Sequence, residues 1–264
     1  MEKADTDIGA TRHVARAVDW RARIRSRLAN TQPQHAENDW ILPGLSAHES
    51  RSYRAYFPAT FIPAAVLIPI IEREEEITVL LTQRASQLKN HAGQISFPGG
   101  RIDPGDESAR AGALREAWEE IGLAEEYVSV AGYLPDHIIV SGFRITPVVG
   151  FVRPGFRLLL AAHEVQDVFE VPVSYLFEPA NHRVRMRNFG EREVEMCDIP
   201  YGKWNIWGAT AGMLMTLYRL CIAADPESPL PADLAAAVPG STAMAGDVRD
   251  PAADSAADAS GPAK

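Results

Sequence analysis

One short segment constrains the fold more than any other, because its apolar and acidic residues fall on different faces of a predicted helix. In residues 109–122, ARAGALREAWEEIG, Leu114, Trp118 and Ile121 recur at steps of four and three, which predicts a face that can be buried. The opposite face carries three carboxylates: Glu116, Glu119 and Glu120. Such a cluster of like charges repels itself unless a divalent cation binds within it.

Both ends of this helix carry recognisable capping residues. Gly122 follows the last apolar residue, where helices commonly end in a left-handed cap. Asp106 or Ser108 supplies the N-cap, and Glu107 places a negative charge near the positive end of the helix dipole. The sequence therefore predicts a short helix that begins just after residue 108 and ends at residue 121.

The context of the helix separates two interpretations of its charges. In the first, the helix is ordinary solvated surface, on which Arg115 pairs with Glu119 four residues further on. In the second, the Gly-Gly turn at residues 99–100 and the helix together resemble the Nudix box of Nudix hydrolases. That box is a glycine, a spacer and then REUxEExGU, in which U is bulky and apolar. The positions that match it are Arg115, Glu116, Glu119, Glu120, Gly122 and Leu123.

The segment departs from the box in two respects. Ala117 is small where the family has a bulky residue, and Gly100 lies fifteen positions before Arg115 instead of fourteen. Glu107 keeps the usual distance to the arginine but is out of step with the glycine, so no role is assigned to it. The longer spacer is typical of coenzyme A pyrophosphatases.

The flanking sequence is similar to the same subgroup. Residues 80–100, LLTQRASQLKNHAGQISFPGG, match the upstream motif LLTxR[SA]xxx[RK]xxxGxxxFPGG of coenzyme A pyrophosphatases. Residues 141–149, 164–172 and 206–211 are also similar to that subgroup, so the resemblance extends over residues 60–222.

Composition excludes several other classes of protein. A formal net charge of −9 over 264 residues argues against a general binder of nucleic acid or membrane surfaces, since both need clustered positive charge. Cys197 and Cys221 are too few for a disulfide framework and are expected to be packed thiols. No apolar stretch is long enough to span a membrane, and the polar N-terminus is unlike a secretory signal. The expected location is the cytoplasm.

The chain divides into three predicted regions. Residues 1–58 form an N-terminal extension with one amphipathic helix near Thr11–Ala29, although Arg21 interrupts its apolar stripe, followed by a linker rich in proline and glycine. Residues 59–223 form the Nudix domain. Residues 224–264 are rich in Ala, Pro, Asp and Ser without periodicity, and are expected to be a disordered tail.

The domain itself alternates strands with helices. A hairpin is expected from residues 64–71 and 77–83, and a second hairpin from residues 183–189 and 193–199, which turns at 188–191. Further strands are expected at 128–134, 145–152 and 171–176, and an apolar helix at 209–223. This order predicts an α/β fold with a mixed β-sheet between helices, which is the α/β/α sandwich that the resemblance implies.

The expected chemistry is metal-dependent hydrolysis of a pyrophosphate. Mg²⁺ or Mn²⁺ prefers oxygen ligands, can neutralise phosphoryl charge and lowers the pKa of bound water. Glu116 and Glu120 are the predicted ligands, together with a carbonyl of the Gly-Gly turn at Gly99 or Gly100. Glu119 is either a third ligand or the group that orients the water, and Arg115 is expected to orient these carboxylates.

The general base and the substrate contacts are less closely defined by pattern. Glu164 is a candidate base, with an ordinary position at a helix N-terminus as the alternative, while His137 and His163 are expected to be surface histidines in loops. The candidate cations for substrate phosphates are Arg84, Lys89 and Arg144, whose alternative is plain surface charge. Phe97 and Phe143 either stack on adenine or belong to the core.

The resemblance implies a specific reaction, which is hydrolysis of coenzyme A or acyl-CoA to 3′,5′-ADP and 4′-phosphopantetheine or its acyl form. Two alternatives stay open. One is a Nudix hydrolase for another nucleoside diphosphate, such as ADP-ribose or NADH; the other is a non-catalytic sensor with the Nudix fold, against which the intact carboxylates argue. The sequence leaves open which acyl chain is preferred and whether the protein is a homodimer.

Overall fold

The computed structural model describes residues 18–33, 53–189 and 192–222 of the chain. Its helices are α1 (Trp20–Leu28), α3 (Ala109–Ile121), α4 (Val173–Leu176) and α5 (Gly208–Ile222), with 3₁₀ turns η1 (Arg54–Tyr56), η2 (Glu125–Tyr127) and η3 (Pro179–Asn181). The strands of the large sheet are β1 (Ile62–Glu72), β2 (Ile77–Arg84), β3 (Ile95–Ser96), β4 (Gly99–Arg101), β5 (Val128–Tyr133), β6 (His137–Ile138), β7 (Phe143–Val152) and β8 (Val165–Pro172). A smaller sheet contains β9 (Arg183–Phe189), β10 (Arg192–Tyr201) and β11 (Trp204–Ile206).

The large sheet is built around a parallel pair. Strand β1 runs parallel to β7 from Ile62↔Phe143 to Ile71↔Val152, and the other pairings in this sheet are antiparallel. The order along the sheet is β3-β2-β1-β7-β5, while β4, β6 and β8 pair with β1, β7 and β2. The run IPAAVLIPIIE in β1 is apolar throughout because the strand is covered on both faces.

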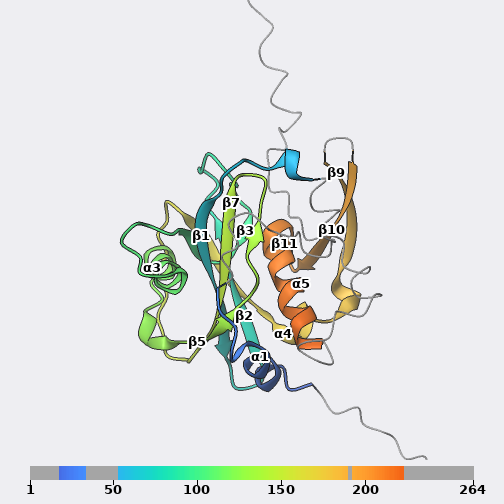
Figure 1. Cartoon of the computed structure of the whole chain (residues 1–264). Coiled ribbons are helices and arrows are strands. Elements are labelled where there is room, and N and C mark those ends of the chain that lie inside the picture. The colour runs from blue at the N-terminus through green and yellow to red at the C-terminus, as the bar shows by residue number, and fades with distance from the viewer. Residues whose placement is uncertain (1–17, 34–52, 190–191, 223–264) are drawn as a thin grey trace, which may run out of the picture.

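Helices cover both faces of this sheet. Figure 1 shows α3 on one side and α5 on the other, with α1 beside the lower end of α5. The α3 side contains a cluster of buried residues that includes Leu67, Leu80 and Val148. The α5 side contains Ile68, Leu81 and most of the aromatic residues of the core. The predicted α/β/α sandwich with a mixed sheet is confirmed.

The packing of α3 corrects one expectation. Trp118 was expected on the buried face, but 58% of it is exposed, whereas Ala117 is 0% exposed. The residues of α3 nearest the sheet are mostly small (Ala109, Gly112, Ala113 and Ala117), with Leu114 and Ile121 beside them. Small residues let the helix axis approach the sheet closely, and Trp118 lies outside that contact. The small residue in the box is therefore a packing position.

The segment after Glu164 is also different from the expectation. Residues 165–172 form strand β8 along β2, and residues 173–176 form the helical turn α4 rather than a strand. Pro172 occupies the last strand position, where its missing N–H does not interrupt the ladder. Glu164 thus precedes a strand and does not stand at the N-terminus of a helix.

The remaining predicted elements are present with shifted ends. Helix α1 begins at Trp20, buries Ile24 and Leu28 and leaves Arg21 exposed, while residues 11–17 lie outside the described part of the chain. Strands β1 and β2 form the first hairpin, and β9 and β10 form the second, of which residues 190–191 are not described. The expected tail at 224–264 also lies outside the described residues. Cys197 and Cys221 are free thiols, as expected.

Candidate active site

The carboxylates of α3 face the glycine turn of β4. Ser108, not Asp106, caps the helix by accepting a hydrogen bond from Ala111 N at 3.1 Å, and Gly122 ends it in the left-handed conformation. Gly99 N donates to Glu120 Oε2 at 3.1 Å. A Cβ at Gly100 would lie 2.5–2.8 Å from the carboxyl group of Glu116, so only glycine leaves room for that side chain.

Asp106 and Arg115 hold the outer side of this cluster. Arg115 donates through Nε and Nη2 to both oxygens of Asp106, each at 3.0 Å, and through Nη1 to Glu116 at 3.1 Å and Glu119 at 2.8 Å. The guanidinium beside Asp106 lowers the pKa of that carboxyl. Arg115 therefore contacts both Glu116 and Glu119, which is the arrangement that an orienting role requires. Its partner is Asp106, six residues after Gly100, and not Glu107.

Burial makes the two inner glutamates costly to ionise. Burial, with a smaller contribution from the charges of Glu116 and Glu164, raises the pKa of Glu120 to about 8, although Gly99 N–H and Arg84 oppose the shift. Burial also raises the pKa of Glu116, against the stabilising charge of Arg115. Two carboxylates that share a half-closed site in this way would be stabilised by a cation.

Glu164 reaches the same site from another part of the chain. The charges of Glu164 act on both Glu116 and Glu120, so the fold brings this residue into the range of the α3 carboxylates. The loop before it is tied to the end of α3, because Leu159 N donates to Ile121 O and Ala161 N donates to Glu120 O, both at 2.9 Å. Glu119 lies on the outside, with its side chain 54% exposed.

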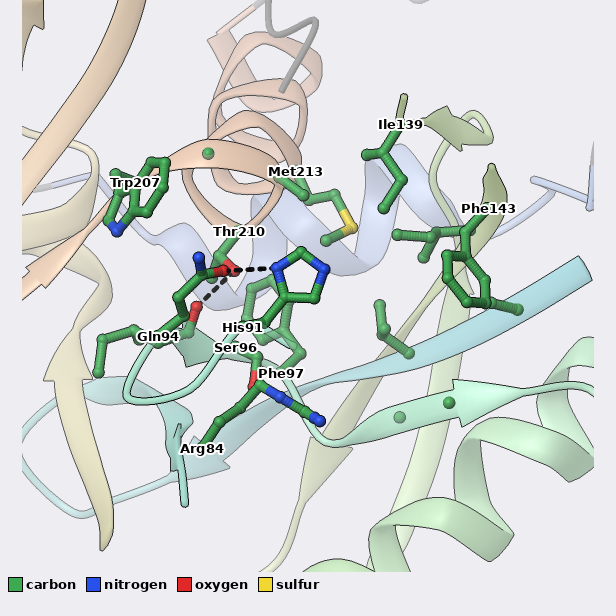
Figure 2. Close-up of a pocket in the computed structure, with 18 of the residues that line it drawn as sticks. Arg84, His91, Gln94, Ser96, Phe97, Ile139, Phe143, Trp207, Thr210 and Met213 are labelled. Atoms are coloured by element: carbon green, nitrogen blue, oxygen red, sulfur yellow. Dashed lines mark hydrogen bonds between the residues drawn. The ribbon is translucent and has the colours of Figure 1, made fainter. Parts of the chain in front are cut away.

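A cavity of about 270 Å³ opens beside the glycine turn. It lies between the strands β1, β3, β4 and β7 and the start of α5, and Gly99 and Gly100 belong to its wall. Figure 2 shows aromatic and aliphatic side chains around it, with polar groups at one end. Its labelled wall residues are Arg84, His91, Gln94, Ser96, Phe97, Ile139, Phe143, Trp207, Thr210 and Met213.

The three candidate cations occupy different surroundings. Arg84 belongs to the cavity wall and approaches Glu120 Oε1 at 4.0 Å through Nη1. Lys89 is exposed on the loop between β2 and β3. Arg144 lies 3.6 Å from Asp136 through Nε, on the opposite side of β7 from the cavity residues Phe143 and Ile145. Of the three, only Arg84 is brought into the site.

The two histidines differ from each other. His137 was expected in a surface loop, but it lies in β6 and is 2% exposed, because β6 pairs with β7 inside the fold. Burial lowers the pKa of His137 to about 4, so it is neutral near pH 7. His163 is exposed as expected, with Nε2 3.3 Å from Glu164 Oε1.

Several wall residues of the cavity were not predicted from the sequence, among them His91, Gln94 and Thr210. Phe97 is buried and Phe143 is half-buried, and both belong to the wall, so the core and binding readings of these aromatics overlap. Arg101 lies with its guanidinium 5.7 Å from the centre of the Phe143 ring. His91, Gln94 and Thr210 come from segments that resemble the subgroup, which was the available signal.

Comparison with known proteins identifies the family. A model of the NUDIX domain matches residues 61–195, which is about half of the chain. The chain belongs to the Nudix hydrolase family. The uncharacterized Nudix hydrolase NudL of Citrobacter koseri is 41% identical over 155 residues, covering 58% of this chain and 80% of that protein. NudL of Escherichia coli is 40% identical over 155 residues with the same two shares.

Solved structures of lower identity are also similar to this Nudix hydrolase. A C. elegans Ap4A hydrolase is 20% identical, covers 42% of this chain and 80% of its own, and has a TM-score of 0.37. A MutT protein from Methanosarcina mazei is 23% identical, covers 45% and 81%, and also has a TM-score of 0.37. No helix among the described residues is long and apolar enough to cross a membrane.

The site of this Nudix hydrolase fits the divalent metal that the family requires. Within the described ranges, no three His, Cys, Asp or Glu side chains form a ready metal cage. Mg²⁺ usually binds one or two carboxylates together with waters and substrate phosphates, so the Glu116 and Glu120 pair suits it. The glycine cradle around Glu116 and the raised pKa of Glu120 point to the same requirement.

Proposed function

We propose that this Nudix hydrolase cleaves the diphosphate bond of coenzyme A and its acyl derivatives. The products are 3′,5′-ADP and 4′-phosphopantetheine or its acyl form. Its family membership makes it a hydrolase of pyrophosphate bonds in nucleoside diphosphate derivatives. The choice of coenzyme A is the finer step, and it rests on where the upstream motif lies in the fold.

The observation that carries this choice is the position of residues 80–100. Arg84, Phe97 and the Gly99–Gly100 turn form part of the cavity wall, and Arg84 and the turn also contact or face the carboxylates. The segment that resembles the coenzyme A motif is therefore part of the site itself. A motif that only stabilised the fold would not need to line the cavity and also contact the carboxylates.

The residues of the site have separate roles in hydrolysis. Glu116, Glu120 and a carbonyl of Gly100 would hold Mg²⁺ or Mn²⁺, which supplies charge neutralisation on the phosphoryl oxygens. Arg115 fixes Glu116 and Glu119, and Arg84 places positive charge on the cavity side of Glu120. These groups are held in place before substrate arrives, so little reorganisation is needed during reaction.

The reaction needs one proton acceptor. The oxygen of a water molecule forms a bond to one phosphorus, the bridging P–O bond breaks, and its electron pair stays on the leaving phosphate. The water gives its proton to Glu164, whose carboxylate is partly exposed and lies in range of Glu116 and Glu120. In an alternative arrangement, Glu119 orients the attacking water. Roles for Lys89 and Arg144 in holding substrate phosphates stay predictions.

Release of 3′,5′-ADP tests the proposal. The purified protein is incubated with Mg²⁺ or Mn²⁺ and coenzyme A, acetyl-CoA, ADP-ribose or NADH, and the products are separated by chromatography. We expect coenzyme A or its acyl forms to give the highest kcat/KM. A higher kcat/KM with ADP-ribose or NADH would contradict the proposal and would indicate a Nudix hydrolase for another nucleoside diphosphate.

Two substitutions test the carboxylates in the same assay. Glu116→Gln and Glu120→Gln keep side-chain volume but remove a ligand, so each should lower kcat by at least about 100-fold. Excess EDTA should abolish activity, and added Mg²⁺ or Mn²⁺ should restore it. Glu126→Gln, at an exposed position in η2, is the matched control and should keep full activity. Near-normal turnover in both ligand variants would contradict the assignment.

A further inference from the structure

The cavity has one polar end, formed by His91 and Gln94. Nδ1 of His91 lies 3.1 Å from Oε1 of Gln94. A carboxamide oxygen only accepts hydrogen bonds, so in this contact Nδ1 donates, and the tautomer with its proton on Nδ1 has its lone pair on Nε2. Figure 2 shows Nε2 on the side of the ring away from Gln94, toward the space between Ile139 and Phe143.

The backbone holds His91 in an uncommon conformation. Its φ is +57°, and it is the one non-glycine residue with positive φ in the described ranges. A side chain in the left-handed region costs roughly 1 kcal/mol or more, so the position favours glycine or asparagine on conformational grounds. Gln94 N closes this turn by donating to His91 O at 3.2 Å. Such an outlier in a cavity wall points to a use for the side chain.

The rest of the cavity offers few polar groups. Its surface is mostly apolar and includes three aromatic side chains: Phe97, Phe143 and Trp207. The hydroxyl of Thr210 donates to Ile95 O at 2.9 Å, and Ser96 Oγ lies 2.9 Å from Thr82 Oγ1, so both hydroxyls already have partners in the protein. Nε2 of His91 is therefore an acceptor in a largely apolar, aromatic space. A planar heterocycle with one N–H donor suits that space.

The order of the charged groups along the site indicates how the substrate is oriented in it. The carboxylates of Glu116 and Glu120 lie at the glycine turn, and Arg101 follows that turn with its guanidinium beside the Phe143 ring. A diphosphate at the carboxylates places the next group of the substrate at Arg101 and the one after it in the cavity. In coenzyme A, the ribose that joins the diphosphate to adenine carries the 3′-phosphate, whereas the pantetheine arm carries no further anion.

We infer that the cavity binds the adenine base, with His91 Nε2 accepting a hydrogen bond from its exocyclic amine and Arg101 facing the 3′-phosphate. The inference rests on the proposed function for the phosphate at Arg101, but the base assignment applies to any adenine nucleotide. The exocyclic amine is the hydrogen-bond donor that adenine presents, and hypoxanthine replaces it with a carbonyl. His91 is thus a specificity-determining residue, and Gln94 positions its ring.

The test compares coenzyme A with its hypoxanthine analogue, in which a carbonyl replaces the exocyclic amine and N1 carries a hydrogen. The wild-type protein should prefer coenzyme A by about 10- to 100-fold in kcat/KM, because the carbonyl would face the lone pair of His91. In His91→Gly, kcat/KM for coenzyme A should fall to the value for the analogue, so that the ratio of the two values approaches one. The same loss is expected in His91→Asn, since asparagine also tolerates positive φ but is too short to reach the base.

Stability measurements separate this role from a structural one. His91→Gly should melt at the same temperature as the wild type or higher, because glycine adopts positive φ without strain. Asn90→Ala, at the exposed neighbouring position, is the matched control and should keep both the melting temperature and the base preference. Equal use of the two substrates by the wild type, or an unchanged preference in both His91 variants, would overturn the inference.

Product inhibition identifies the arm that occupies the cavity. 3′,5′-ADP should inhibit the wild type and lose at least about tenfold in potency with His91→Gly, while 4′-phosphopantetheine should inhibit both proteins equally. The reverse pattern would overturn the adenine assignment. If coenzyme A is not cleaved but ADP-ribose is, with the same preference over its hypoxanthine analogue, the proposed function fails and the adenine site stands.

Discussion

At the scale of single residues, Glu120 couples the stability of the protein to pH. Its pKa is about 8 in the folded chain, against 4.5 as the ordinary value for the unfolded chain. Between these values the folded state holds more protons, so the free energy of unfolding falls as the pH rises, by at most about 1.4 kcal/mol per pH unit. The penalty is absent below pH 4.5 and complete above pH 8.

Glu120→Gln should remove most of this dependence. In EDTA, we expect the melting temperature of the wild type to fall between pH 5 and 8, and that of Glu120→Gln to stay nearly level and lie above it at pH 8. Thermal unfolding followed by circular dichroism measures both curves. Mg²⁺ should raise the melting temperature of the wild type at pH 8 more than that of the variant. An equal slope in both proteins would show that another group causes the pH dependence.

Asp106 and Glu107 differ in their expected importance although they are neighbours. Asp106→Asn removes the charge that holds Arg115 through two hydrogen bonds of 3.0 Å. We expect kcat to fall by roughly 10- to 100-fold with little change in KM, because Arg115 no longer fixes Glu116 and Glu119. Glu107→Gln should be unchanged, since its exposed side chain lies outside this network. Steady-state kinetics measures kcat for both variants. A larger fall of kcat in Glu107→Gln than in Asp106→Asn would instead assign the role to Glu107, which has the usual distance from Arg115.

The same two residues show what residue patterns could predict. The helix, its left-handed cap and the facing of Glu116 and Glu120 toward the glycine turn follow from local spacing, and the structure has them. Local spacing does not decide whether Asp106 or Glu107 binds Arg115. It also does not decide whether Ala117 or Trp118 is buried. Both depend on how the loop and the sheet contact α3. Those contacts come from residues far away in the chain, so no local pattern contains them.

At the scale of elements, strands with long apolar runs were predictable, but short ones were not. β1, β2 and β7 carry their signal in many consecutive apolar residues. β3, β4 and β6 contain two or three residues each and exist because β2, β1 and β7 provide a partner edge. Part of the cavity wall is built from β3 and β4 and the loop before β3. His91, Gln94 and Ser96 were therefore missed as wall residues, although the resemblance had marked their segment.

Helix α1 packs closely against the sheet at a glycine of β5. Gly132 lies under the end of α1, where a Cβ would overlap Leu28 O and Thr31 Oγ1. Thr31 Oγ1 also accepts from Tyr133 N at 2.7 Å, and Arg25 lies 3.9 Å from the Phe151 ring centre. The segment before the Nudix domain therefore contributes a helix to the core of the sheet.

Gly132→Ala should consequently destabilise the whole fold. Displacing α1 from the strand should cost about 1–3 kcal/mol of unfolding free energy, the usual range for overpacking. Gly105→Ala is the matched control, because nothing lies within 4 Å of a Cβ at that position, and it should be nearly neutral. Urea unfolding of both variants measures the difference. Equal stability would mean that α1 does not pack on β5 as the structure has it.

At the scale of the whole molecule, charge opposes the proposed substrate. The formal net charge of −9 repels a polyanion, so binding depends on the metal and on local cations such as Arg84 and Arg101. Residues after Asp225 include six acidic and two basic side chains. Removing them would change the formal net charge from −9 to −5, while the NUDIX match ends at residue 195. Nearly half of the net negative charge thus lies outside the part of the chain that matches the NUDIX domain.

Truncation after Asp225 should therefore separate long-range charge from stability. The removed segment has no apolar periodicity, so the melting temperature should change by less than about 2 °C. At low salt, kcat/KM for coenzyme A should rise by roughly two- to fivefold because repulsion is weaker, and the gain should disappear near 0.15 M salt, where the Debye length is about 8 Å. Melting curves and kinetics over a salt series measure both effects. A large fall in melting temperature, or an equal gain at all salt concentrations, would instead show that the segment contacts the folded domain.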